Sequence, residues 1–240
     1  MTFKTVLPSV PELWDGFLHL LYPELCVACS DDLPVAGGCF CLNCRLKISV
    51  SDMHHNRENE FTERFWGRMP LESAAAMYYF SRKNPIQRAL HQLKYHNQPE
   101  IGIKIGRDFG RKLKSAPGFS AVDAIVPVPL HPKKERLRGY NQSAMFAKGL
   151  AESMEIPVIY HALVRNIFTG TQTRKKRMDR FENVGNVFSL KQTASLEGKH
   201  IMLVDDVLTT GATLEMCGQE ILNARGTRLS LATIAIALSN

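Results

Sequence analysis

The chain has 240 residues, 45% of them hydrophobic, and this length suits one medium-sized domain together with a small module. Residues 1–70 hold six Lys or Arg against nine Asp or Glu, a net charge of −3, whereas residues 71–240 hold 24 against 14, a net charge of +10. This basic part suits a polyanionic ligand or nucleic acid. No segment approaches the ~20 apolar residues that cross a bilayer, and the start of the chain lacks a signal-peptide pattern. We therefore expect no membrane span and a cytoplasmic protein.

Five of the six cysteines lie between residues 26 and 44, after a short amphipathic helix that we predict at residues 13–25. Two Cys-x-x-Cys pairs separated by eleven residues have the spacing of a tetrahedral zinc site. Disulfides would suit a secreted protein, but an odd cluster without an export signal favours a metal. Such a closed site is structural rather than catalytic. The preferred ligands are Cys26, Cys29, Cys41 and Cys44, and Cys39 is an alternative to Cys41.

Residues 51–69 are polar, and we interpret them as a linker or a solvated helix that carries His54 and His55 on the surface. The next predicted elements are a strand at residues 74–80 and two helices, one beginning at Pro85 and one at residues 101–113. We therefore predict two domains. The first comprises a helix, the zinc module and a linker at residues 1–70, and the second covers residues 71–240.

Strands and helices alternate along the rest of the chain. The predicted order is a strand at 124–130, a polar loop at 131–142, a helix at 143–154, a candidate strand at 158–160, a polar stretch to about 187, a strand at 201–204, a helix at 214–222 and a strand at 228–238. Such alternation predicts an α/β fold with a mostly parallel sheet flanked by helices. Ligands of these folds gather at the carboxyl ends of the strands.

One segment, residues 201–213, predicts a ligand class. Asp205 and Asp206 should emerge at the end of the strand, where carboxylates accept hydrogen bonds from vicinal sugar hydroxyls. The turn after them opens a helix whose free N–H groups suit a phosphate. The alternative is an ordinary N-capped helix, but a cap needs one such residue, not two acids and three threonines.

This segment resembles the 5-phosphoribosyl-1-pyrophosphate (PRPP) motif of type I phosphoribosyltransferases. The resemblance implies that the acidic pair binds the ribose 2′ and 3′ hydroxyls and that the turn binds the 5′-phosphate. The residues expected to bind PRPP are Asp205, Asp206, Val207, Leu208, Thr209, Thr210, Gly211, Ala212 and Thr213.

Two basic segments are candidates for the remainder of the site, although a solvated basic loop is the simpler interpretation of the first. The loop at 131–142 follows a strand, as the PRPP motif does, so both can face one ligand and hold its pyrophosphate. The stretch 163–184 has six cations against two acids and little periodicity, which is typical of a mobile lid. The candidates are Lys133, Lys134, Arg136, Arg138, Gly139 and Asn141 in the loop, and Arg165, Thr169, Gln172 and Arg180 in the lid.

Taken together, these motifs resemble the ComF/GntX family. The segments that carry the resemblance are the cysteine pairs, Leu93-Lys-Tyr, Pro127-Val-Pro-Leu, Arg138-Gly-Tyr-Asn-Gln, and the set Arg165, Thr169, Gln172, Arg180 and Asn183. The resemblance implies a type I phosphoribosyltransferase fold with an N-terminal zinc module and a role in DNA uptake during natural transformation. Cys39, Phe40 and the extended linker at 51–69 depart from the pattern.

Two functions follow as hypotheses. In the first, the protein binds PRPP with magnesium and transfers the phosphoribosyl group to an unidentified acceptor, as a glycosyltransferase whose candidate catalytic residues are Asp205 and Asp206. In the second, it is a non-catalytic protein that handles single-stranded DNA, or a regulator that senses PRPP. A DNA-uptake helicase or another competence protein is the expected partner. No segment has the signature of a hood that reads a base, so the acceptor stays open.

Overall fold

The computed structural model describes residues 25–31, 33, 38–82, 84–166, 187–191 and 193–238. The helix predicted at 13–25 lies outside this part except for its last residue. Within it, no helix combines the length and apolarity needed to span a membrane. The helices are α2 (Leu42–Arg45), α3 (Glu60–Glu63), α4 (Pro85–Tyr95), α5 (Pro99–Leu113), α6 (Pro132–Arg138), α7 (Gln142–Met154) and α8 (Ala212–Leu222), with 3-10 turns at Met53–His55 and Thr193–Ser195.

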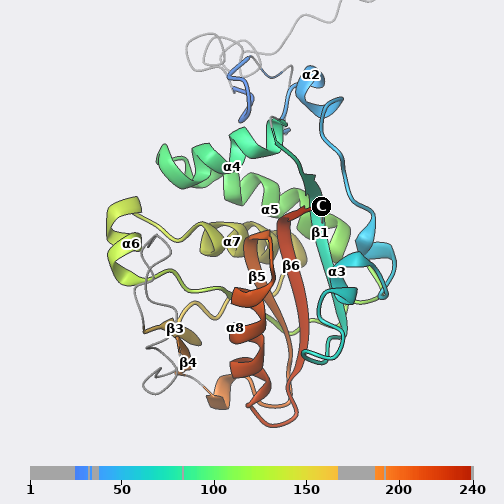
Figure 1. Ribbon diagram of the computed structural model, residues 1–240, viewed down its shortest axis with the longest axis vertical. Helices are drawn as coiled ribbons and strands as arrows, with labels where there is room; N and C mark the ends of the chain where they lie inside the picture. Colours follow the sequence, from blue (N-terminus) through green and yellow to red (C-terminus); the bar gives the residue numbers. More distant parts are fainter. Residues whose placement is uncertain are drawn as a thin grey trace, which may run out of the picture.

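A four-stranded parallel sheet forms the centre of the molecule (Figure 1). Its order is β1 (Ser73–Phe80), β6 (Arg228–Ala237), β5 (His200–Leu208) and β2 (Ala124–Pro127). The two central strands are almost wholly buried, as their mostly apolar sequences require of a sheet covered on both faces. A separate antiparallel pair, β3 (Leu163–Arg165) with β4 (Phe188–Leu190), lies beside it. The predicted α/β fold with a parallel sheet flanked by helices is therefore confirmed.

The direction of the crossovers places a crevice between β2 and β5. After β2 the chain runs through α7 to Val158, which makes a single parallel bridge with Ile125 on the outer side of β2. After β5 it runs through α8 to β6, in the opposite direction along the sheet. Because both crossovers are right-handed, the two helices cover opposite faces, and Figure 1 shows α8 in front of the sheet with α7 behind it. Parallel sheets bind ligands at such a switch point, at the carboxyl ends of the strands.

Glycines let α5 and α7 approach each other closely on one face of the sheet. A Cβ at Gly106 of α5 would lie 2.4 Å from the carbonyl oxygen of Phe146, and one at Gly149 of α7 would lie 2.1 Å from that of Ile103. No side chain fits at either position. This contact fixes the axis of α7 and therefore the position of its first residues at the crevice.

The segment 51–69 is not the solvated linker that its polarity predicts. Phe61 and Phe65 are fully buried, and α3 packs against β1. Asn59 caps α3 and also donates to the carbonyl of Ala74, 2.9 Å away, which joins the segment to β1. His54 is buried and His55 exposed, so the surface prediction is wrong for His54. The prediction missed these contacts because two buried aromatic residues among many polar ones give no periodic signal. The domain boundary near residue 70 stays a prediction.

Three boundaries of predicted elements also differ. The polar loop at 131–142 contains α6, which buries none of its residues, so apolar periodicity could not reveal it. The candidate strand at 158–160 is reduced to the single bridge at Val158. The strand predicted at 201–204 continues to Leu208, so the acidic pair lies within β5 rather than after it.

Candidate functional site

A cleft of about 240 Å³ opens at the carboxyl ends of β2 and β5. Pro127, the last residue of β2, pairs with Val204, whereas β5 continues for four more residues. Beyond Val204 the strand has no pairing with β2, and Asp205 and Asp206 from this part of β5 line the cleft. Its lining comes from the end of α4, from the segment between β2 and the start of α7, from β3 and from the acidic pair.

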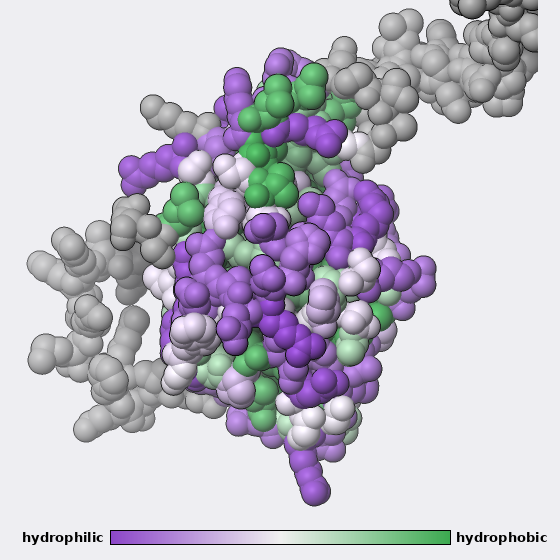
Figure 2. Space-filling view, turned by 90° about the vertical axis from the view of Figure 1, so that its right-hand side faces the viewer, coloured by the Kyte–Doolittle hydropathy of each residue, from purple (hydrophilic) through white to green (hydrophobic). Residues whose placement is uncertain are grey.

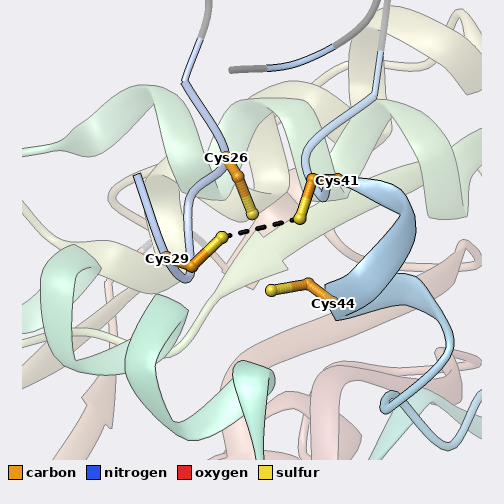
Figure 3. A group of neighbouring side chains, drawn as sticks. All are labelled: Cys26, Cys29, Cys41 and Cys44. Carbon is orange, nitrogen blue, oxygen red and sulfur yellow. Dashed lines mark hydrogen bonds between the residues drawn. The ribbon is translucent and has the colours of Figure 1, made fainter. Parts of the chain in front are cut away.

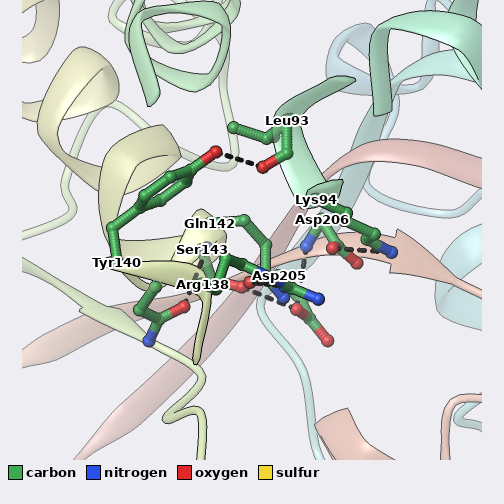
Figure 4. Close-up of polar contacts among 9 residues, drawn as sticks. Leu93, Lys94, Arg138, Tyr140, Gln142, Ser143, Asp205 and Asp206 are labelled. Atoms are coloured by element: carbon green, nitrogen blue, oxygen red, sulfur yellow. Dashed lines mark hydrogen bonds and ion pairs between the residues drawn. The ribbon is translucent and has the colours of Figure 1, made fainter. Parts of the chain in front are cut away.

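The acidic pair is held by a different partner on each carboxylate (Figure 4). Asp205 Oδ1 accepts hydrogen bonds from the Ser143 hydroxyl and from the Asp206 backbone N–H, both at 2.8 Å. Asp206 Oδ2 lies 2.8 Å from Lys94 Nζ, and the Asp206 side chain is only 7% exposed. The first turn of α7 and the last turn of α4 thus orient the two carboxylates.

The surroundings of Asp205 raise the pKa of its carboxyl group. Burial, together with the neighbouring Asp206 carboxylate, raises the pKa of Asp205 to about 7, against the opposing effects of the Ser143 hydroxyl, the Asp206 N–H and Lys94. Desolvation disfavours the charged form, and a like charge nearby does the same. A buried carboxyl with a raised pKa at a cleft is a candidate functional residue, because a folded protein gains no stability from holding it there.

The end of α4 contributes two side chains that the sequence analysis did not assign to the site. Lys94 pairs with Asp206, and Tyr95 is 68% exposed with the guanidinium of Arg138 5.7 Å from its ring centroid. The Tyr140 hydroxyl donates to the carbonyl of Leu93 and anchors this end of the helix. The signal was present, because Leu93-Lys-Tyr and the segment from Arg138 belong to the family pattern. The sequence pattern alone assigned no role to Lys94 and Tyr95, because only the fold brings these two segments together.

The turn after β5 forms a second hollow, of about 40 Å³, lined by Asp205 and residues 207–214. Gly211 adopts a left-handed conformation with φ of 82° and serves as the N-cap of α8. The Thr210 hydroxyl lies 3.4 Å from the Ala212 N–H. A helix N-terminus without a charged cap is an anion site. The expected PRPP residues 205–213 therefore lie together at one edge of the sheet. Thr213 lines both the cleft and the second hollow.

The basic segment after β2 divides into two groups. Lys134 and Arg138 line the cleft, whereas Lys133 and Arg136 stand outside its lining. Gly139 ends α6 with φ of 86°. Asn141 has a structural part in the site: its amide nitrogen donates to the Val128 carbonyl at 2.9 Å, and its side-chain oxygen caps α7.

Only the first of the lid candidates falls within the described residues. Arg165 of β3 lines the cleft, and its guanidinium lies 5.2 Å from the Phe188 ring centroid. Thr169, Gln172 and Arg180 lie outside the part of the chain that the structure describes.

The four preferred cysteines form one group (Figure 3). The sulfur atoms of Cys26, Cys29, Cys41 and Cys44 all lie within 4.8 Å of one another, and Cys29 Sγ is 3.5 Å from Cys41 Sγ. The second pair is held by α2, which begins right after Cys41. Four converging sulfurs with no disulfide between them suit a tetrahedral thiolate metal site.

Cys39 stands apart from this group. Its Sγ lies 3.9 Å from Asp108 Oδ2 on α5, and burial, with the nearby Asp108 carboxylate, raises the pKa of the Cys39 thiol to about 12. Cys39 therefore contacts α5 and is not a member of the cluster of four cysteines. Beside it, Leu42 and Leu46 are exposed, and Figure 2 shows a mostly hydrophilic face with hydrophobic side chains gathered at the end where α2 lies.

Comparison with known proteins shows which proteins this chain resembles. The phosphoribosyl transferase domain family matches residues 141–239, a range that includes α7, β5, α8 and β6. Competence protein F of Haemophilus influenzae is 28% identical over 203 residues, 83% of this chain and 84% of that protein. Competence protein ComFC of Bacillus subtilis is 28% identical over 225 residues, 92% and 88% of the two chains.

DNA utilization protein YhgH of Escherichia coli is 31% identical over 141 residues, 58% of this chain and 61% of that protein. Adenine phosphoribosyltransferase of Saccharomyces cerevisiae superposes with a TM-score of 0.40 at 14% identity, over 81% of this chain and 86% of that one. The domain match and the parallel sheet define the class: this is a phosphoribosyltransferase-like protein. The matches to competence protein F and ComFC, which extend over most of the length of both proteins, support a relationship with the ComF proteins.

Proposed function

We propose that the protein binds PRPP, together with magnesium, in the cleft between β2 and β5. The observation that carries the proposal is the buried carboxylate pair, Asp205 and Asp206, next to a turn that opens α8. In this pose the pair accepts hydrogen bonds from the ribose hydroxyls, and the turn at Thr209–Thr213 receives the 5′-phosphate. The pyrophosphate lies toward Lys134, Arg138 and Arg165, which line the same cleft.

The donor set fits magnesium that arrives with the ligand. Among the described residues that line the cleft, Asp205 and Asp206 are the only carboxylates, and Asp206 is already paired with Lys94. Magnesium keeps several waters and binds through substrate phosphates and one or two carboxylates. It would neutralise the pyrophosphate, and the chain's own part is to hold the ribose and to place cations around the leaving group.

Phosphoribosyl transfer to an acceptor is the reaction that this arrangement supports. The bond between C1 of the ribose and the pyrophosphate oxygen would break, the acceptor would bond to C1, and the cations of the cleft would stabilise the departing pyrophosphate. The acceptor is unassigned. A protein that only senses PRPP would need the same binding residues, so the reaction is a separate proposal from binding.

The names of the relatives supply the cellular role that we propose, which is competence or DNA uptake. A specific observation favours direct handling of single-stranded DNA as a second function. Helix α6 buries none of its residues, carries four cations and exposes Leu137 to 90%. A solvated basic helix of this kind suits a phosphate backbone. A DNA-uptake helicase or another competence protein is the protein partner that we propose.

The zinc module is proposed as a structural site with Cys26, Cys29, Cys41 and Cys44 as ligands. Their sulfur atoms converge, and the segment around them is too small to bury a core of its own. Four thiolates leave no open coordination position, so the metal would stabilise the module rather than take part in a reaction.

Calorimetric titration with magnesium and PRPP tests the main proposal. Wild-type protein should bind, and the double variant Asp205→Asn with Asp206→Asn should lose measurable affinity, because amide groups replace both acceptors of the ribose hydroxyls. Glu152→Gln, which changes an exposed carboxyl on α7, is the matched control. Equal affinity in the double variant and the wild type, or no binding by the wild type, would refute PRPP binding in this cleft.

A further inference from the structure

Three residues from outside the PRPP motif cover the outer side of the phosphate turn. Arg64 Nη1 donates to the Thr209 carbonyl at 3.0 Å, and its Nη2 donates to the Ala237 carbonyl at 2.6 Å, at the end of β6. Arg68 Nη1 lies 3.5 Å from the Thr210 carbonyl and 3.0 Å from that of Arg64. These arginines follow α3, about 140 residues before the turn in the sequence.

The contacts with the Thr209 and Thr210 carbonyls fix the direction of two peptide groups of the turn. In a trans peptide the carbonyl and the next N–H point in opposite directions, and the described part of the chain has no cis peptide. With the Thr209 carbonyl held by Arg64, the Thr210 N–H faces the other side. Because the Thr210 carbonyl lies beside Arg68, the Gly211 N–H also faces away from the arginines. Neither arginine is among the residues that line the small hollow, so we infer that this hollow lies on that other side of the turn.

The third residue, Phe65, closes the same side of the turn. A Cβ at Gly211 would lie 2.9 Å from Phe65 Cζ, so the fully buried ring rests directly against the glycine. The guanidinium of Arg68 lies 5.4 Å from the centroid of this ring and pairs with Glu215 in the first turn of α8. The Phe65 ring and the Glu215 carboxylate therefore both hold Arg68 in place. If the Thr209 and Thr210 carbonyls turned toward the hollow, their contacts with Arg64 and Arg68 would be lost.

We propose that Arg64 and Arg68 are positioning residues of the 5′-phosphate site, which hold the Thr209–Gly211 peptides so that their N–H groups face the phosphate. The proposal rests on the proposed PRPP binding and deepens it. The segment 57–69 becomes a working part of the ligand site, although it precedes the matched phosphoribosyl transferase domain by more than 70 residues. The ligand feature that it serves is a sugar 5-phosphate, which ribose 5-phosphate shares with PRPP.

Titration of the full chain with ribose 5-phosphate tests the assignment, with magnesium pyrophosphate as the ligand that lacks the 5-phosphate. The variants are Arg64→Ala, Arg64→Lys and Arg68→Ala, and Arg107→Ala, which removes an exposed arginine of α5, is the control. Each of the three should weaken ribose 5-phosphate binding about tenfold, the equivalent of one charged hydrogen bond. Magnesium pyrophosphate and the control variant should show wild-type affinity.

The lysine variant separates charge from geometry. Lysine keeps the positive charge, but one ammonium cannot reproduce the two-armed contact of Arg64 with the carbonyls of Thr209 and Ala237. Full affinity in Arg64→Lys, unchanged ribose 5-phosphate affinity in Arg64→Ala, or equal losses for both ligands would each overturn the proposal. Failure of the wild type to bind PRPP is a different result, and it would reject the proposed function itself.

Discussion

Lys94 Nζ lies 2.8 Å from Asp206 Oδ2, so the last turn of α4 neutralises a carboxylate that is almost wholly buried in β5. The pair joins two elements that are more than 100 residues apart in the sequence. Any ligand that uses the acidic pair must share Asp206 with this lysine. A substitution at Lys94 should therefore change both the free energy of unfolding and the binding of such a ligand.

Removal of Lys94 should destabilise the protein, because it leaves a buried carboxylate without its partner. Lys94→Met keeps most of the aliphatic stem but leaves the Asp206 carboxylate without its partner, which should lower the free energy of unfolding by about 1–3 kcal/mol at pH 8. Urea denaturation at pH 8 measures this loss.

The companion variant Lys94→Met with Asp206→Asn removes both charges and should recover much of that loss, as expected of a coupled pair. Lys104→Met, on the neighbouring helix α5, is the control for loss of a lysine. Additive effects of the two substitutions would show that the ion pair makes no contribution.

Asp205 should make the protein less stable as the pH rises. Its pKa is raised to about 7 from an ordinary value of 3.8, so between these values the folded protein binds a proton that the unfolded chain releases. The free energy of unfolding then falls with increasing pH across that window. Asp205→Asn removes this dependence and should gain about 1–4 kcal/mol relative to the wild type between pH 4 and pH 8.

Chemical denaturation across that pH range, with Glu152→Gln as the control carboxyl variant, is the measurement. The stabilised variant should at the same time bind PRPP more weakly, because it has lost an acceptor for the ribose hydroxyls. Parallel pH profiles for Asp205→Asn and the wild type would show that Asp205 is ionised as easily in the folded protein as in the unfolded chain.

The features that could be predicted from the sequence are those that lie within one short segment of the chain. The buried strand 201–204 and the turn at Thr209–Thr213 lie in one continuous segment, so their relation follows from the order of residues. The same holds for the cysteine pairs, whose spacing alone brings four sulfurs together. Even there the pattern left Cys39 and Cys41 undecided, because a choice between them depends on which one faces α5.

The relations that the sequence missed all join distant segments. Arg64, Phe65 and Arg68 meet the phosphate turn only because α3 packs against the sheet, and the segment's mixed polarity concealed its two buried aromatics. Lys94 reaches Asp206 from the end of α4, where the Tyr140 hydroxyl donates to the neighbouring Leu93 carbonyl. The sequence predicts a loop where α6 lies, since a helix that buries none of its residues has no hydrophobic period.

Gly211→Ala should damage the phosphate turn more than its backbone angle alone explains. An alanine there must adopt a φ near 82°, and its Cβ would lie 2.9 Å from the Phe65 ring. Gly198 provides a matched control, because its φ is 69° and a Cβ there meets nothing within 4 Å. Gly198→Ala should cost about 1–2 kcal/mol from the left-handed conformation alone.

Gly211→Ala should exceed that cost and also weaken ribose 5-phosphate binding by about tenfold or more, as a displaced turn loses its N–H contacts. Thermal denaturation and calorimetric titration give the two quantities. If both glycine variants lose the same stability and neither loses affinity, Phe65 does not constrain the turn.

The cysteine module should lose its metal with Cys41 but not with Cys39. Protein purified without chelators should contain about one zinc per chain, as a four-thiolate site requires. Cys41→Ser removes one of four converging sulfurs, so it should release the metal and lower the thermal midpoint of unfolding. Cys39→Ser changes a thiol that faces Asp108 instead, and zinc content should stay at the wild-type level. Metal analysis of both variants distinguishes the two ligand sets, since retention of zinc in Cys41→Ser together with its loss in Cys39→Ser would exchange the assignments.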